Sequence, residues 1–361
     1  MKIAYLFTLD PALSTGVFKK IKSQIRHWQA AGHTVRAFHV RPVTSEFDSS
    51  SLSDLEENWQ SYVRPLGLSG IVDRVNTWRA LADDVIEWGP DVAYYRYSRF
   101  WPGLGRLARN VPTVAELNTV EREYYGRARK WYYYHRATKP YFFRQLAGIV
   151  CVTREICREY SGRGYPDERR VIANGIDLGE YEVLPPSYSE TPELVFIGHG
   201  NPWDGIPKIL KLATIRPRWT FHIIGDIEEP GDAPKNVHFH GYLERSDYER
   251  LFERADAGIG TLALYEKDMT EASPLKVREY LAYGLPVIVG YDDTDFQDDQ
   301  PFLLQLPNHA DNIETEIERI AEFVERWHGR RVPRQSVQHI DARRKEDARL
   351  DFFEAVIRSE R

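Results

Sequence analysis

The sequence is poor in cysteine and has no long apolar run. Only two of its 361 residues are cysteines, Cys151 and Cys157, which excludes a fold held together by many disulfides. Their spacing is not that of a zinc or redox pair, so we expect two packing residues in a protein of the reducing cytoplasm. No stretch approaches the roughly 18 apolar residues of a membrane span, and the N-terminal apolar run is too short for a secretory signal.

The sequence also lacks the excess of basic residues that nucleic-acid-binding proteins carry. Its formal net charge is -6, which argues against nucleic acid as a partner. Residues 1–186 hold 26 Lys and Arg against 21 Asp and Glu, a net charge of +5. Residues 187–361 hold the other 22 and 33, a net charge of -11. Halves of opposite sign predict two domains with different partners.

What the sequence does contain is an alternation of short apolar strands with helices. Residues 2–7 and 34–40 are predicted strands on either side of a helix, which makes a βαβ unit. Residues 184–192 contain three prolines and are typical of a linker, after which the pattern restarts. The other predicted strands are residues 92–95, 113–117, 149–152, 170–172, 194–197, 221–224, 237–239 and 285–289.

This pattern predicts the α/β class with two Rossmann-like domains that face an interdomain cleft. We expect the first domain to comprise residues 1–186 and the second to comprise residues 187–340. Residues 341–361 are highly charged and then amphipathic, and we expect them to form a helix that packs back toward the N-terminal domain.

A dense group of functional side chains lies in residues 265–290. Ser273 is a suitable N-cap and Pro274 a suitable first residue of a helix, and Gly284 is suited to its end. We therefore predict a helix over residues 274–283 that leads into a buried strand. The start of a helix presents N–H groups and a positive dipole end, which suit a phosphate.

Charged residues surround this predicted helix start. Glu271 precedes the helix and Glu279 lies within it, while Lys276 and Arg278 add positive charge. Carboxylates accept hydrogen bonds from sugar hydroxyls. A diphosphate at the helix start would place one carboxylate near a ribose and the other near a second sugar.

The segment resembles the nucleotide-sugar signature of the family 4 glycosyltransferases, which are retaining enzymes of the GT-B fold. The resemblance lies in two Glu eight positions apart, the Ser-Pro-Leu-Lys turn, and the Glu-Tyr-Leu-Ala-Tyr-Gly-Leu-Pro-Val run. It implies that Glu271 contacts the transferred sugar and that Glu279 holds the ribose hydroxyls. It also implies that the backbone around Ser273, Pro274 and Leu275 binds the diphosphate.

Glycines at other predicted strand ends resemble the family pattern in the same order. Gly16 is similar to the glycine that lets the backbone approach the donor phosphates. Gly198 lies in the loop after the first strand of the second domain, and Gly225 is expected to line the base or ribose region. Asn174 begins an Asn-Gly turn that we take as mainly structural.

The loop after Gly198 departs from the family pattern. The family commonly has an Arg and a Lys here that meet the diphosphate, whereas this chain has His199 and Asp204. Lys276, Arg278 or His199 could supply the charge, or the backbone could hold the phosphates. Alternatively, the chain is catalytically weak.

Residues 114–121 end a strand of the first domain and resemble the place where many family members carry a His facing the reaction centre. Here the sequence is Glu-Leu-Asn. The resemblance implies that Asn118 contacts a sugar hydroxyl and that Glu116 or Glu121 orients the acceptor. In this family acceptor identity lies in variable loops such as residues 42–70, to which we assign no structure.

A basic, aromatic stretch follows at residues 122–144. It holds seven Lys and Arg against one acid, together with nine Trp, Tyr and Phe. Such a mixture suits an anionic membrane surface or a lipid-phosphate acceptor, and an ordinary solvated helix is the alternative. The residues predicted for this acceptor or membrane face are Arg127, Arg129, Lys130 and Trp131.

These features together predict a retaining glycosyltransferase that moves a sugar from a nucleoside-diphosphate sugar to a hydroxyl acceptor. Its setting would be glycan, polysaccharide or glycolipid synthesis, in the cytoplasm or at the inner face of the membrane. We expect no metal or other cofactor, because no Asp-x-Asp motif sits at the end of a predicted strand, and we take Asp292 and Asp293, like Asp298 and Asp299, as surface acids. The alternatives are a GT-B epimerase or inverting transferase, and a non-catalytic subunit that binds nucleotide sugars.

Overall fold

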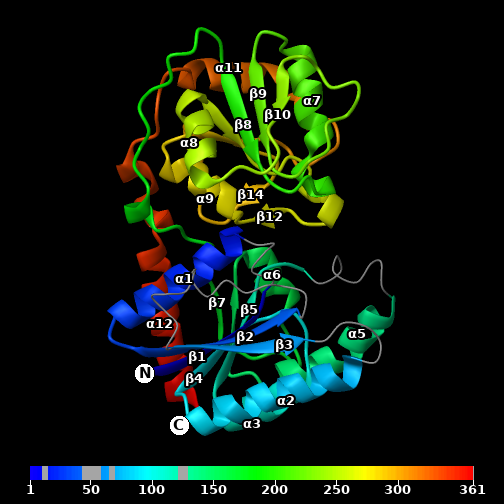
Figure 1. Cartoon of the computed structure of the whole chain (residues 1–361), viewed down its shortest axis with the longest axis vertical. Coiled ribbons are helices and arrows are strands. Elements are labelled where there is room, and N and C mark those ends of the chain that lie inside the picture. The colour runs from blue at the N-terminus through cyan, green and yellow to red at the C-terminus, as the bar shows by residue number, and fades with distance from the viewer. Residues whose placement is uncertain (10–14, 43–57, 65–69, 121–128, 361) are drawn as a thin grey trace. The chain divides into compact units, whose positions relative to one another are not determined.

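The computed structural model describes residues 1–9, 15–42, 58–64, 70–120 and 129–360. The chain forms two compact units, one of Met1–Ala173 with Arg343–Arg361 and one of Asn174–Ala342 (Figure 1). The division falls before the predicted boundary at residue 186. The reason is that residues 174–186 make their contacts within the second unit, where for example Leu184 N–H donates to the Tyr283 carbonyl at 3.0 Å.

The first unit is built on a seven-stranded sheet in the order β3-β2-β1-β4-β5-β6-β7, and each neighbouring pair is parallel. Its strands are β1 (Lys2–Thr8), β2 (Thr34–Pro42), β3 (Trp59–Arg64), β4 (Val92–Arg96), β5 (Thr113–Leu117), β6 (Gly148–Cys151) and β7 (Arg169–Val171). Its helices are α1 (Thr15–Ala30), α2 (Gly70–Trp88), α3 (Pro102–Asn110), α5 (Arg129–Phe143), α6 (Arg154–Glu159) and α12 (Ala342–Ser359). Strand β3 was not predicted, since it lies in the segment to which the sequence analysis assigned no structure.

The C-terminal helix α12 packs against the sheet of the first unit. The ring of Phe353 lies 5.1 Å from that of Tyr94 on β4 and 5.7 Å from that of Trp28 on α1. Gly148 on β6 allows this close approach, because a Cβ there would lie 2.9 Å from the ring of Phe352. The last helix is therefore part of the core of the first unit.

The second unit is built on a six-stranded parallel sheet in the order β10-β9-β8-β11-β13-β15. Its strands are β8 (Glu193–Ile197), β9 (Thr220–Ile224), β10 (Val237–Phe239), β11 (Ala257–Ile259), β13 (Val287–Val289) and β15 (Leu303–Gln305), with a parallel pair β12 (Glu271–Ala272) and β14 (Asp292–Asp293) beside them. Its helices are α7 (Ile206–Ile215), α8 (Arg245–Arg254), α9 (Leu275–Ala282), α10 (Asn312–Thr315) and α11 (Ile317–Trp327). Its 3₁₀ turns are η3 (Leu178–Glu180), η4 (Pro202–Asp204), η5 (Leu264–Lys267) and η6 (Arg334–Ile340).

The two cysteines form a disulfide between the end of β6 and α6. Cys151 and Cys157 have Cα atoms 5.5 Å apart and are bonded to each other. The expectation of two unpaired packing residues was therefore wrong, because the turn from strand to helix brings positions six residues apart together. The argument for a reducing compartment that rested on unpaired cysteines no longer applies.

Candidate functional site

The predicted donor-binding segment forms strand β12 followed by helix α9. Pro274 is the N-cap of α9, and Gly284 follows the helix with a φ of 82°, which is the left-handed conformation expected at that place. The helix thus begins one residue later than predicted. Glu271 lies on β12 and is 6% exposed, and Glu279 is half-buried within the helix.

Ser273 does not cap the helix but fixes the loop before it. Its Oγ accepts hydrogen bonds from the Asn174 N–H at 2.9 Å and from Arg278 Nη2 at 2.8 Å. The Asn174 side-chain amide also donates to the Ser273 carbonyl at 2.6 Å. The Asn-Gly turn therefore has the structural role expected of it, since it holds the segment that leads into α9.

Arg278 is fully buried and serves an internal ion cluster. Its guanidinium donates to both oxygens of Asp293 at 2.7 and 2.8 Å and to Asp295 at 3.0 Å. This planar pairing is the preferred geometry of arginine with a carboxylate. Arg278 therefore does not supply the missing cation of a phosphate site. The prediction of Asp293 as a surface acid was wrong, because its side chain is 0% exposed.

Lys276 points to the loop that follows β8. Its Nζ lies 2.7 Å from Asp204 Oδ1, and a Cβ on Gly198 would lie 2.8 Å from this Nζ. Burial lowers the pKa of Lys276, and the Asp204 carboxylate acts against this shift. Lys276 thus brings one ammonium group from α9 to the loop in which His199 is exposed.

The glycines predicted at the donor site differ in how strictly the backbone requires them. Gly225 has a φ of 135°, and a Cβ there would lie 1.8 Å from the Gly198 carbonyl oxygen. The loops after β8 and β9 therefore touch, and only glycine fits at position 225. Gly16 lies in the first turn of α1, in the first unit, and is exposed.

The half-buried Glu279 has a neighbour that the sequence did not point out. Tyr248 on α8 donates its hydroxyl to Glu279 Oε1 at 2.7 Å. Burial and the charge of Glu279 raise the pKa of Tyr248, so it stays a phenol that donates. This hydrogen bond orients the Glu279 carboxylate. The remaining acceptor positions of the carboxylate can receive hydrogen bonds from the two hydroxyls of a diol.

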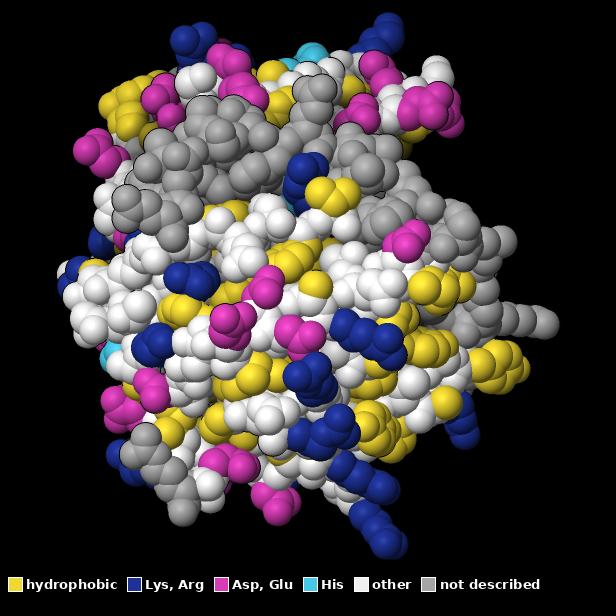
Figure 2. All heavy atoms as spheres, turned by 60° about the horizontal axis from the view of Figure 1, so that its bottom comes forward, with side chains coloured by type: hydrophobic (Ala, Val, Ile, Leu, Met, Phe, Trp, Pro, Cys, Tyr) yellow, Lys and Arg dark blue, Asp and Glu magenta, His cyan; other side chains and the backbone are white. Residues whose placement is uncertain are grey.

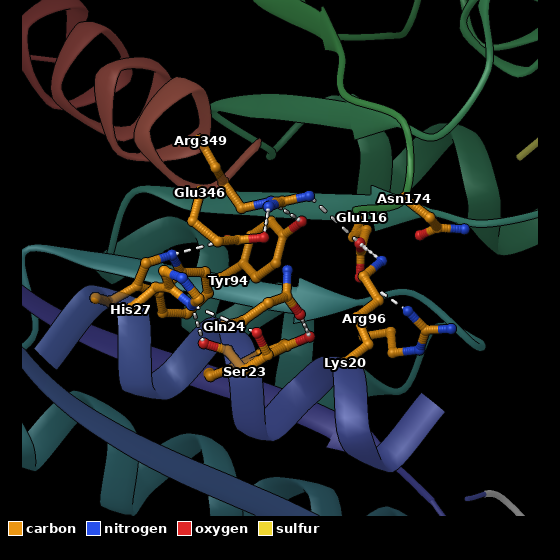
Figure 3. A network of polar contacts seen from close by, with 12 residues as sticks. Lys20, Ser23, Gln24, His27, Tyr94, Arg96, Glu116, Asn174, Glu346 and Arg349 are labelled. Atoms are coloured by element: carbon orange, nitrogen blue, oxygen red, sulfur yellow. Dashed lines mark hydrogen bonds and ion pairs between the residues drawn. The ribbon is translucent and has the colours of Figure 1, made fainter. Parts of the chain in front are cut away.

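In the first unit, Glu116 lies at the centre of a buried ion cluster (Figure 3). Its side chain is 0% exposed and lies 2.5 Å from Lys20 Nζ, 3.0 Å from Arg96 Nη1 and 3.8 Å from Arg349 Nη2. Glu346 of α12 pairs with Arg349 in turn. The cluster joins β5 to α1, β4 and α12. This placement argues against direct contact between Glu116 and a substrate, and we assign it a positioning role.

The cluster holds its charges at neutral pH. Burial alone would raise the pKa of Glu116, but the charges of Lys20, Arg96 and Arg349 outweigh burial and hold that pKa well below its usual range. Burial lowers the pKa of Lys20 to about 8, although Glu116 acts in the opposite direction. Lys20 is therefore the member of the cluster that is easiest to neutralise.

A polar pocket of about 100 Å³ lies at the carboxyl ends of β1, β4 and β5. We call it the Arg96 pocket. Arg96 Nη1 donates to Asn118 Oδ1 at 3.0 Å as well as to Glu116, so the structure brings two of the predicted residues together around a guanidinium. The pocket is lined by Thr8, Arg96, Tyr97, Ser98, Leu117, Asn118 and Thr119.

The predicted acceptor or membrane face falls largely outside the described residues. Nothing is described of Arg127 or of the side chains of Arg129, Lys130 and Trp131. Farther along α5, Phe142 and Phe143 are buried, while Tyr133 and Tyr141 are exposed. The aromatics of the stretch therefore divide between the core and the surface.

The surface of the first unit that includes α2 and α3 carries apolar and charged side chains of both signs in a mixed arrangement (Figure 2). On it, Arg106 of α3 pairs with Asp83 of α2, and both side chains are at least half exposed. In the parts of the chain that the structure describes, none of the helices is long and apolar enough to span a membrane.

Sequence reasoning missed Lys20, Arg96, Arg349 and Glu346 of the Glu116 cluster, Asp295 beside Arg278, and Tyr248 beside Glu279. Arg96 directly follows the apolar part of a predicted strand, which is the position where functional side chains gather in parallel sheets. That signal could have identified it. No local pattern marks Arg349 or Tyr248, because their partners lie 233 and 31 positions away in the chain.

Solved structures share the fold over nearly the whole chain. A glycosyltransferase from Rickettsia africae has a TM-score of 0.67 at 11% identity and covers 99% of both chains. The Anabaena protein HepE, solved with UDP and glucose, has a TM-score of 0.63 at 14% identity and covers 98% of this chain and 99% of its own. The pneumococcal O-GlcNAc transferase GtfA, solved with UDP and GlcNAc, has a TM-score of 0.65 at 10% identity and covers 99% of both. With its two parallel-sheet units, the chain has the architecture of the GT-B glycosyltransferases.

Family models match both units. The model described as Glycosyltransferase Family 4 matches residues 15–180, and the model described as Glycosyl transferases group 1 matches residues 191–322. A comparison with curated protein sequences finds no match. With a Glycosyltransferase Family 4 match over its first unit and a group 1 match over most of its second, the chain is a glycosyltransferase, as the resemblance at residues 265–290 indicated.

Proposed function

We propose that the protein is a retaining, metal-independent transferase that moves a sugar from a nucleoside-diphosphate sugar to a hydroxyl acceptor. The observation that carries the proposal is the placement of Glu271 and Glu279 on either side of the start of α9. The first N–H groups of a helix have no partner within the helix. They and the dipole suit a diphosphate between the two carboxylates.

The roles follow from this placement. Glu279, oriented by Tyr248, holds the ribose hydroxyls. Glu271 receives hydroxyls of the transferred sugar. The backbone of residues 273–275 and the ammonium of Lys276 hold the diphosphate, and Gly198 and Gly225 allow the two strand-end loops to approach it.

The reaction is the departure of the nucleoside diphosphate from the anomeric carbon. Negative charge develops on the β-phosphate oxygens, and preorganised donors there stabilise the transition state. The acceptor hydroxyl attacks from the face that the diphosphate leaves, forms the new C–O bond, and gives its proton to a phosphate oxygen. The configuration at the anomeric carbon is retained, and no protein nucleophile or metal ion takes part. The acceptor belongs to glycan, polysaccharide or glycolipid synthesis.

Calorimetric titration with UDP-, GDP-, ADP- and TDP-sugars, without added metal, tests the donor site. We expect one donor to bind. Glu279→Ala should weaken the binding of this donor by about 1.5–3 kcal/mol, which is the scale of a hydrogen bond to a charge. This corresponds to a loss of affinity of roughly 10- to 100-fold. Glu322→Ala is the control, since this exposed glutamate lies on α11. Unchanged affinity in a folded Glu279→Ala protein would refute the ribose assignment.

One observation favours a second candidate, a subunit that binds nucleotide sugars without turnover. The ammonium of Lys276 already faces the buried carboxylate of Asp204, so less positive charge is available to the leaving diphosphate than in a loop with an Arg and a Lys. Donor binding without any release of nucleoside diphosphate, with acceptor extracts present, would establish this alternative.

A further inference from the structure

The Arg96 pocket contains buried hydrogen-bond donors that the described residues do not satisfy. An arginine can only donate, so the Asn118 atom that faces Arg96 Nη1 is the amide oxygen. The Asn118 Nδ2 group is therefore a donor directed elsewhere. Among the described residues, neither this nitrogen nor Thr119 Oγ1 has a hydrogen-bond partner, although both atoms are buried. Buried donors in folded proteins are usually paired, which indicates a ligand atom that accepts.

The charges around the pocket indicate the kind of ligand atom. The described cluster comprises three cations (Lys20, Arg96, Arg349) and two anions (Glu116, Glu346), a net charge of +1. Arg96 is the cluster member nearest to solvent, with 17% of its side chain exposed. None of the described residues that line the pocket is acidic. A guanidinium beside two buried hydrogen-bond donors suits an oxyanion rather than a cation.

The size of the pocket limits what enters it. A volume of about 100 Å³ suits one small group of a ligand, since whole ligands occupy pockets of roughly 300–1,000 Å³. The guanidinium is already held by Glu116 and Asn118. It therefore receives a carboxylate or phosphate in a fixed orientation and without further ordering.

We propose that the Arg96 pocket binds an oxyanion carried by the sugar acceptor, which is received by Arg96, Asn118 Nδ2 and the Thr119 hydroxyl. The acceptor is then an acidic sugar or a sugar phosphate rather than a neutral one. This inference rests on the proposed function only in naming the ligand an acceptor. The binding of the anion itself is a property of the first unit.

Three probes with the same sugar ring test the inference: glucuronate, glucose 6-phosphate and glucose. Ligand-observed NMR titration of the full chain at low ionic strength measures each affinity. We expect at least one of the two anions to bind at least ten times more tightly than glucose. The anion that binds identifies the source as a carboxylate or a phosphate ester.

Variants show whether binding occurs in the pocket. We expect Arg96→Met to abolish the preference for the anion. Thr119→Val and Asn118→Ala leave the pairs of Glu116 with Lys20 and Arg349 in place, and each should lower the affinity for the anion at least threefold. Arg106→Met removes an exposed arginine on α3 and should leave the affinity for the anion unchanged.

Two results would overturn the inference. One is equal affinity for glucose and both anions. The other is anion binding that survives Thr119→Val and Asn118→Ala in folded protein. Titration of a nucleoside-diphosphate sugar into the same samples reports on the donor site separately. Loss of donor binding with retained anion binding would reject the proposed function alone, and the reverse would reject this inference alone.

Discussion

Each unit has a buried ion cluster built around a fully buried charge, Glu116 in the first unit and Arg278 in the second, and these two charges have opposite signs. In the first unit the carboxylate of Glu116 is surrounded by three cations. In the second unit the guanidinium of Arg278 is paired with Asp293 and Asp295. The first cluster fixes the last helix to the sheet. The second fixes the loop before α9, through Ser273.

The difference shows which buried charges can serve a ligand. The Arg278 cluster has a net charge of -1 and its arginine is 0% exposed, so a cation beside a predicted phosphate site need not bind phosphate. Counted over the described residues, the Glu116 cluster has a net charge of +1, and it presents Arg96 to a pocket. It also contains Lys20, which can lose its proton, whereas a guanidinium cannot.

The largest expected effect comes from Arg278→Met. It removes the guanidinium that pairs with Asp293 and Asp295, and removing one partner of a buried ion pair typically costs about 3–5 kcal/mol. Urea unfolding followed by tryptophan fluorescence measures this loss in the second unit. An exposed pair provides the control, and Asp83→Asn should change stability by less than about 1 kcal/mol. A similarly small effect for Arg278→Met would contradict the assigned role.

We expect Glu116→Gln to cost less, about 3 kcal/mol at pH 7, because Lys20 can be neutralised. Without Glu116 the folded-state pKa of Lys20 falls further below about 8. The unfolded variant then binds one proton more than the folded variant from that lower pKa up to about pH 10, the usual lysine pKa. In the unaltered protein this window opens only near pH 8, so between the two folded-state pKa values the stability of the variant alone rises with pH. The difference in unfolding free energy between the variant and the unaltered protein, measured by urea unfolding, should therefore become smaller from pH 7 to 9. A gap independent of pH would show that Lys20 is not coupled to Glu116.

A smaller effect concerns acid stability. Burial, helped by Lys139 and Arg99, lowers the pKa of His135 to about 3. The unfolded state, with a histidine pKa near 6.5, binds the extra proton below that pH. Stability from His135 is therefore complete above pH 6.5 and is lost as the pH falls, by up to about 1.4 kcal/mol per unit.

His135→Phe removes this loss from the first unit. The buried His222 of the second unit also has a lowered pKa and keeps its own acid sensitivity. We expect the variant to lose less stability than the unaltered protein between pH 6.5 and 5 in thermal unfolding. Identical pH slopes for both proteins would contradict the placement of His135.

The smallest expected effect tests the contact that orients Glu279. Tyr248→Phe removes one hydrogen bond to a carboxylate. It should lower the affinity for a nucleoside diphosphate about 3- to 10-fold, roughly 1 kcal/mol. A 2′,3′-dideoxy nucleotide lacks the diol and should bind both proteins equally. Tyr283→Phe is the matched control, because Tyr283 bonds to Glu249 instead. An equal loss with the dideoxy nucleotide would indicate a merely structural effect.

The sequence predicts those parts of the molecule that depend on local patterns. The apolar strands, the position of α9 to within one residue, and the glycine after it follow from periodicity and turn chemistry. The Glu271 and Glu279 pair was found because its spacing along the chain is itself the pattern. Gly225 could be predicted as a strand-end glycine, but the contact with the Gly198 carbonyl that requires it could not.

The remainder depends on contacts between distant positions. From the sequence, Glu116 was an acid at a strand end that could orient the acceptor. Only its ion pairs with Lys20 and Arg349 in the folded chain show that it connects β5 to α1 and α12. Asp293 looked like a surface acid in a loop until Arg278 paired with it. The Cys151–Cys157 disulfide likewise depends on a turn geometry that the spacing alone does not reveal.

The central claim is that a nucleotide sugar binds where β12 leads into α9. Amide hydrogen exchange of the full chain, with and without saturating nucleoside-diphosphate sugar, tests it most directly. The account predicts slower exchange in residues 271–280 and 198–200, and little change at the edge strand β3 of the first unit. It also predicts that Glu279→Ala reduces this protection at the same ligand concentration. Binding by calorimetry without protection of residues 271–280 would contradict the account.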